Sequence, residues 1–223
     1  MNQVRWGTPW HGLEALLDGR NLALGLAVLF LARTNGLLYL INSVNESELV
    51  EKARRKLLMN SIAFLVFFLF FIITLLASPG FTYEKATATV TLEKFKYLHN
   101  LIEMPVVLIL FLAGVSGVIF GLSSALFKGS RTGIWYTGTG TILAVISLFL
   151  LSGFNDTAFY PSVQDLNSSL TIYKASSSLF TLKTMMYVSF IVPLVIGYIW
   201  YAWKSINVRR ITGEEMEEEG HIY

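Results

Sequence analysis

Histidine has the widest chemical range of the residues in this chain, because its imidazole binds haem iron and most other metals and carries protons near neutral pH. The sequence contains three: His11, His99 and His221. None lies in an apolar segment, no two have the spacing of a metal site, and cysteine is absent. A haem held within a membrane by axial histidines or a thiolate, and cysteine-ligated iron–sulfur clusters, therefore have no ligands here. We expect no catalytic, cofactor-binding or metal-binding residue in this chain.

Arg33 is the only charged residue inside an apolar segment, and a charge at membrane depth is by default a candidate functional site. It belongs to the polar sequence Ala32-Arg33-Thr34-Asn35-Gly36. Two interpretations are open. Arg33 contacts a lipid, a quinone or another subunit within an assembly, or its long side chain extends to the nearer layer of headgroups.

Glu103 follows His99 by four positions, a spacing that places both on one face of a helix. At the membrane boundary such a pair can exchange protons with the solvent. Glu103 also opens the third apolar segment, where a carboxylate stabilises the helix dipole by about 0.3–1 kcal/mol. The sequence is compatible with a proton-exchange role and with a capping role.

Glycines recur at a spacing of three and four in the third apolar segment, at Gly114, Gly117 and Gly121. Residues 117–121 match the GxxxG pattern, which lets two helix backbones approach closely. The alternating threonines and glycines of residues 137–141 extend this pattern to the fourth segment. We predict tight helix packing, either within the chain or against a partner.

The elements that position these residues are membrane-spanning helices. Hydrophobic residues make up 54% of the 223 residues and charged residues only 14%. The apolar residues gather in five segments, each long enough to cross about 30 Å of hydrocarbon at about 1.5 Å per residue: residues 21–41, 57–78, 104–127, 134–151 and 184–203. None of them alternates polar and apolar residues as a membrane β-strand does. We predict an all-α fold, an integral membrane helical bundle of about five transmembrane helices.

The distribution of basic residues predicts the orientation of this bundle. Segments 42–56, 128–133 and 204–223 hold nine Lys and Arg in 41 positions, whereas segments 1–20, 79–103 and 152–183 hold seven in 77. We therefore expect an outer leader (1–20), a transmembrane bundle (21–203) and a cytoplasmic tail (204–223), with the N-terminus outside and the C-terminus inside.

The last predicted span has two further features. Pro193 is expected to kink it, and its final residues are rich in the aromatic side chains that mark the headgroup layer: Tyr198, Trp200, Tyr201 and Trp203. In the connection before it, residues 155–157 and 167–169 fit the glycosylation triplet, which is common by chance.

The second long connection and the last span carry a more specific pattern. It reads Tyr160-Pro161-Ser162, then Asn167-Ser168-Ser169-Leu170-Thr171-Ile172-Tyr173-Lys174-Ala175-Ser176-Ser177-Ser178, then Leu182-Lys183-Thr184-Met185-Met186. In the order and spacing of these residues, this segment resembles subunit II of the cytochrome bd quinol oxidases. The resemblance includes Pro193 and the aromatic residues that end the last span. Weaker resemblance extends back through residues 97–100 and 103–105 to the first span, and so covers nearly the whole chain.

The family begins with a further block of helices that contains a DGFDxG motif, and this sequence has no such motif. The chain therefore resembles the C-terminal half of subunit II, either as part of a longer chain or as a separately made piece. The acidic residues proposed for proton uptake in the family belong to the unmatched half, so none of them is carried onto this chain.

The resemblance implies an integral subunit of a respiratory terminal oxidase of the bacterial inner membrane. The complex oxidises quinol and reduces oxygen to water in aerobic respiration. In this family haem b and haem d belong to subunit I, which implies that the present chain is haem-free. Its implied partners are a haem-bearing subunit I, membrane lipid and, in some members, a bound quinone.

Other classes of function compete with this one. Half of a secondary transporter requires broken helices and polar groups that converge near the midplane, and the second and third apolar segments have almost no polar groups. An intramembrane enzyme requires a paired nucleophile and base within the spans, which the sequence lacks. Nucleic acid is not an expected partner, because the formal net charge is only +2 and no basic stripe is interleaved with aromatic residues.

Overall fold

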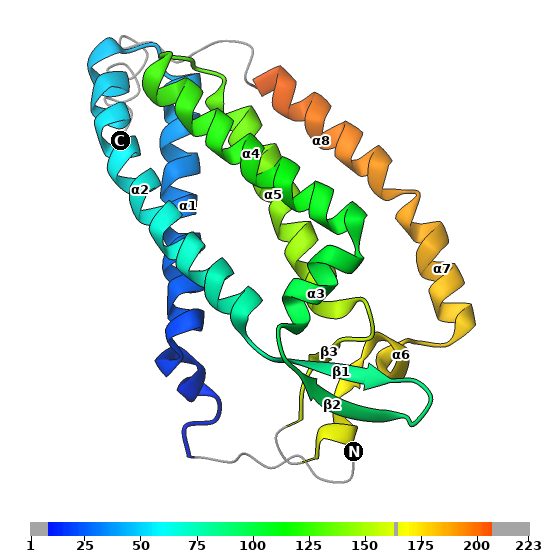
Figure 1. Cartoon of the computed structure of the whole chain (residues 1–223). Helices are drawn as coiled ribbons and strands as arrows, with labels where there is room; N and C mark the ends of the chain where they lie inside the picture. Colours follow the sequence, from blue (N-terminus) through cyan, green and yellow to red (C-terminus); the bar gives the residue numbers. More distant parts are fainter. Residues whose placement is uncertain (1–8, 163–164, 207–223) are drawn as a thin grey trace.

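The computed structural model describes residues 9–162 and 165–206. Within them, five helical segments are long and apolar enough to cross a membrane: Gly19–Ser43, Ser47–Ala77, Pro105–Phe127, Gly133–Gly153 and Leu179–Ile206. In Figure 1 most of the last of these, drawn in orange, stands apart from the other four. The predicted helical membrane bundle is confirmed, and the chain is a multi-pass membrane protein. The direction in which the bundle crosses the membrane stays a prediction.

The first two spans form a helical hairpin. A short 3-10 turn, η1 (Leu13–Leu17), leads into α1 (Gly19–Ser43), whose first turn is capped by the Asp18 carboxylate. Helix α2 (Ser47–Ala77) begins well before the span predicted from residue 57. Its first turns carry ion pairs between residues four apart, Glu48 with Lys52 and Glu51 with Arg55, which favour continued helix outside the hydrocarbon layer. The segment 42–56, which we expected to be a connection between two spans, is therefore mostly helical.

The third and fourth spans form a second hairpin, α4 (Pro105–Phe127) and α5 (Gly133–Gly153). Pro105 starts α4, a position where the missing N–H costs no helical hydrogen bond. The two hairpins pack through a core of fully buried apolar side chains that includes Leu38 of α1, Leu57 of α2 and Ala125 of α4. This core fixes the relative positions of the four helices.

The fifth span is two helices, α7 (Leu179–Ser189) and α8 (Val192–Ile206). Pro193 lacks an N–H, and its ring would clash with the carbonyl of Ser189 in a continuous helix. The chain turns between the two helices instead, so the kink expected at Pro193 is a break in the helix. No residue of α7 or α8 is buried, whereas each of the other four spans has buried residues.

The two long connections fold into a small layer of strands and short helices at one end of the bundle (Figure 1). We call it the outer layer because it lies beyond the ends of the spans, and the name does not refer to a side of the membrane. Strands β1 (Gly80–Glu84) and β2 (Thr89–Glu93) pair antiparallel, with Gly80 opposite Glu93. Strand β3 (Ala158–Tyr160) pairs antiparallel with β4 (Leu170–Thr171), and a bridge between Thr82 and Thr157 links the two sheets. Helix α3 (Lys96–Glu103), the 3-10 turn η2 (Leu166–Ser168) and α6 (Ile172–Ala175) complete this layer. The sequence patterns that we used did not predict these strands.

Candidate functional site

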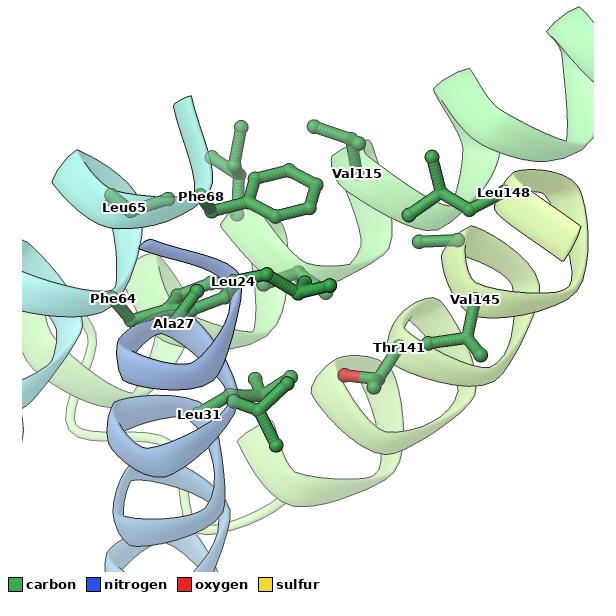
Figure 2. Close-up of a pocket in the computed structure, with 14 residues that line it drawn as sticks. Leu24, Ala27, Leu31, Phe64, Leu65, Phe68, Val115, Thr141, Val145 and Leu148 are labelled. Carbon is green, nitrogen blue, oxygen red and sulfur yellow. The ribbon is translucent and has the colours of Figure 1, made fainter. Parts of the chain in front are cut away.

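A cavity of about 80 Å³ lies between the two hairpins, beside the central turns of α4 and α5 (Figure 2). Fourteen residues of α1, α2, α4 and α5 line it, and thirteen of them are apolar: Leu24, Ala27, Val28, Leu31, Phe64, Leu65, Phe68, Val115, Val118, Ile119, Ala144, Val145 and Leu148. The exception, Thr141, donates its hydroxyl hydrogen to the carbonyl oxygen of Thr137 at 2.8 Å. The cavity therefore suits an apolar guest and offers none of the ligands that a metal requires.

Close contact between α4 and α5 forms one side of this cavity. A Cβ atom added at Gly114 would lie 2.5 Å from the backbone nitrogen of Ala144, and one added at Gly140 would lie 2.6 Å from the carbonyl oxygen of Gly114. At Gly121 an added Cβ would meet the side chain of Thr137. The glycine pattern thus packs these two helices backbone to backbone within the chain, which was one of the two predicted possibilities.

The polar sequence around Arg33 divides between two faces of α1. Arg33 is exposed, and no hydrogen bond or ion pair joins it to another residue in the part of the chain that the structure describes. Thr34 is fully buried, and its hydroxyl oxygen lacks a hydrogen-bond partner among the described residues, as do the Asn35 side-chain oxygen and the Thr137 hydroxyl. The role of Arg33 at a partner or at the headgroups stays a prediction.

A polar cluster in the outer layer centres on Glu93. One carboxylate oxygen accepts hydrogen bonds from the hydroxyl of Thr82 at 2.5 Å and lies 3.3 Å from Nζ of Lys96, and the other lies 2.7 Å from Nδ1 of His99. The hydrogen bonds from Thr82 and His99, with the charge of Lys96, lower the pKa of Glu93 to about 2. Glu93 therefore fixes β1, β2 and α3 to one another.

A second polar cluster joins the outer layer to the helix ends. The buried side-chain amide of Asn100 donates to the carbonyl oxygen of Leu151 at 3.0 Å and to the hydroxyl of Thr157 at 2.7 Å. The amide of Asn155 donates to Oδ1 of Asn100 at 3.0 Å and to Oε2 of Glu103 at 2.5 Å. These bonds connect the end of α3 with the end of α5.

The candidate residues of this region lie in other positions than the sequence led us to expect. Glu103 ends α3 rather than opening the third span. Helix α4 begins at Pro105, and its N-cap residue is Met104, with no side-chain capping hydrogen bond, so Glu103 does not hold the capping position that the sequence allowed. His99 contacts Glu93 and not Glu103. Asn155 and Asn167, which begin the two glycosylation triplets, both use their side chains in hydrogen bonds within the outer layer.

The structural role of Asn100 was missed by the sequence patterns. Its signals were a polar side chain near a span boundary and its place in residues 97–100, which share the weaker family resemblance. Across residues 9–162 and 165–206, no three His, Cys, Asp or Glu side chains gather as a metal site. His221 lies outside the described residues.

The comparison with known families covers most of the chain. No curated protein matches the sequence. The family model described as cytochrome bd terminal oxidase subunit II matches residues 3–206, which include all five spans and the outer layer. The chain therefore belongs to the cytochrome bd terminal oxidase subunit II family and is an integral membrane subunit of a respiratory oxidase.

Proposed function

We propose that this chain is a haem-free subunit that supports a haem-bearing subunit I in a cytochrome bd-type oxidase. The observation that carries the proposal is the family match over residues 3–206. In this proposal the complex oxidises quinol and reduces oxygen to water, and the present chain supplies no catalytic residue. Its contribution is a rigid membrane surface on which subunit I assembles.

The membrane-embedded residues do not fit a haem. The cavity between the hairpins, about 80 Å³, is smaller than an apolar cavity of about 150 Å³ that binds a molecule of the size of benzene. A haem iron also needs an axial ligand such as histidine, and His11 and His99 both lie outside the five spans. These observations support placing haem b and haem d in the partner subunit.

A quinone fits the cavity between the hairpins only through its apolar tail. The redox ring of a quinone needs hydrogen-bond donors, and Thr141, the one hydroxyl that lines the cavity, already donates to the carbonyl of Thr137. A methyl-branched hydrocarbon chain needs no polar partner. In our proposal any quinone held here therefore has a structural role, with its tail beside the cavity and its ring outside it.

Arg33 supports a contact with subunit I along α1. Its side chain is exposed on an apolar span, where an unpaired charge costs about 2.5–3.5 kcal/mol near the helix centre. An acidic or polar group on a neighbouring subunit would remove this cost. We therefore propose that the face of α1 that carries Arg33 belongs to the interface with subunit I.

The transporter alternative receives less support from the same geometry. A transport site needs polar groups that converge near the midplane, and the cavity at that depth is lined by apolar side chains and Thr141 alone. Among the described residues, the break before Pro193 resembles the broken helix of a transporter. It lies on α7 and α8, which have no buried residues, and so does not face this cavity.

The proposal is tested by purifying the chain through a tag at Tyr223 after gentle solubilisation of its native membranes. We expect a larger partner on the gel and the visible absorption bands of haem b and haem d. The matched control is the same chain expressed without the partner, which should be colourless. A colourless, partner-free protein from native membranes, or haem bound to the chain alone, would overturn the proposal.

A further inference from the structure

An aromatic pocket of about 200 Å³ lies at the end of the bundle opposite the outer layer. It is lined by six residues, Tyr39 and Asn42 of α1, Trp135 of α5, and Trp200, Trp203 and Lys204 of α8. These residues come from the last turns of α1 and α8 and the first turn of α5. Three spans that are distant in sequence thus meet at one level of the membrane.

Trp203 is the centre of this pocket. Its ring centroid lies 5.7 Å from that of Tyr39 and 6.3 Å from that of Trp135, the latter in an edge-on arrangement. Although they contact one another, these rings remain between 39% and 55% exposed. Aromatic rings with one apolar side and one polar edge prefer the level at which acyl chains give way to headgroups. The pocket therefore opens at the headgroup layer.

The charge of the pocket is positive. Nζ of Lys204 lies 5.2 Å from the ring centroid of Trp200, and no acidic residue lines the pocket. In the described part of the chain no carboxylate forms an ion pair with Lys204. The amide of Asn42 adds a neutral hydrogen-bond donor. A cation beside an amide donor, with no acidic residue among the described lining residues, complements a phosphate group.

The apolar surface beside the pocket complements two acyl chains. Helices α7 and α8 contain no buried residue, and their large apolar side chains, such as Leu194 and Ile199, are more than half exposed. Figure 1 shows α7 and most of α8 standing apart from α4 and α5. A molecule with an anionic head at Lys204 and long apolar chains along α8 matches both surfaces.

We propose that this pocket binds the headgroup of an anionic phospholipid, and that the acyl chains of the same lipid pack along α8. The lipid phosphate accepts hydrogen bonds from Lys204 and Asn42, and the aromatic rings hold the glycerol region. In this way a lipid fastens α8 to α1 and α5. The proposal does not depend on the oxidase assignment, because the purification test and the lipid test have separate readouts.

The test measures lipid binding to the purified full chain, with any partner that accompanies it, in neutral detergent. Brominated phosphatidylglycerol quenches tryptophan fluorescence on contact, and brominated phosphatidylcholine is the zwitterionic comparison. The difference between the native chain and Trp203→Phe isolates the signal of the pocket. We expect saturable quenching by phosphatidylglycerol at lower concentration than by phosphatidylcholine.

Charge variants at one end of the bundle make the test specific. Lys204→Gln should weaken phosphatidylglycerol binding about fivefold, equivalent to about 1 kcal/mol, whereas Lys204→Arg should retain it. Lys128→Gln removes the same charge from the end of α4, outside the pocket, and should bind like the native chain. Size-exclusion elution and melting temperature check that each variant is folded.

Three results would overturn the proposal. The first is equal quenching by the two lipids, and the second is unchanged phosphatidylglycerol binding in Lys204→Gln. The third is quenching that appears only after residues 213–223 are removed, because the acidic tail of this chain would then be the natural occupant of the pocket.

Discussion

Gly140 provides the sharpest test of how α4 and α5 pack. A Cβ atom at this position would lie 2.6 Å from the carbonyl oxygen of Gly114 and 2.7 Å from the backbone nitrogen of Val118. Ordinary contact begins at 3.4 Å, so the helices must separate by roughly 0.8 Å to accept a methyl group. Because both obstacles are backbone atoms, no side-chain rotation relieves the overlap.

The change in stability caused by Gly140→Ala combines an unfavourable and a favourable contribution. Overpacking of a well-packed contact typically costs about 1–3 kcal/mol, whereas replacing glycine by alanine within a helix returns up to about 1 kcal/mol. We therefore expect Gly140→Ala to lower the free energy of unfolding by about 1–2 kcal/mol. At about 2–4 °C per kcal/mol, the melting temperature of the purified protein should fall by several degrees.

Gly138→Ala is the matched control for this variant. It makes the same chemical change in the same helix two residues earlier, where an added Cβ meets no atom within 4 Å. Thermal unfolding of both variants is followed by far-UV circular dichroism in one detergent. We expect Gly138→Ala to melt at or above the temperature of the native chain. If the two variants melted together, the inferred backbone contact between α4 and α5 at Gly140 would be refuted.

Three further predictions concern the polar residues. Asn100→Ala leaves the buried hydroxyl of Thr157 and the carbonyl of Leu151 without this donor, so we expect a loss of about 1–3 kcal/mol in the same melting assay; an unchanged melting temperature would contradict the role of this bond. The pKa of Glu93 is lowered from 4.5 to about 2, so its stabilisation is present above pH 4.5 and is lost as the pH falls from 4.5 towards 2. The melting temperature of Glu93→Gln should change less over that range than that of the native chain, and parallel curves would count against the cluster. Arg33→Leu should leave membrane insertion intact and lower the recovery of the partner subunit severalfold, whereas full recovery would mean that Arg33 extends to the headgroups.

The spans were predictable because each rests on a local property of the sequence. A run of apolar residues long enough to cross the bilayer forms a helix whatever its neighbours, since backbone groups in hydrocarbon must be satisfied internally. The glycines of α4 were also informative, because close approach requires small residues on the helix itself. The start of α2 was less predictable, since charged turns such as those of residues 47–56 can continue a helix beyond the hydrocarbon.

The outer layer was harder to predict because its structure depends on distant residues. The strands β1 and β2 are rich in β-branched and aromatic residues, and that composition was a usable signal for a hairpin. The role of Asn100 was not accessible in the same way. Its partners Leu151 and Thr157 lie more than 50 residues away, and only the folded arrangement of α3 and α5 brings them together.

Helix α8 shows what hydropathy leaves undetermined. Its hydropathy is similar to that of the other four spans. In a membrane, however, high hydropathy shows that a helix is compatible with lipid, and it does not show that the helix contacts another helix. Contact needs small residues that face a neighbour, and at Gly197 of α8 an added Cβ would meet no atom within 4 Å. The position of α8 is therefore set at its end, where Trp203 meets Tyr39 and Trp135. If a lipid occupies that pocket, the packing of the fifth span depends on the composition of the membrane as well as on the sequence.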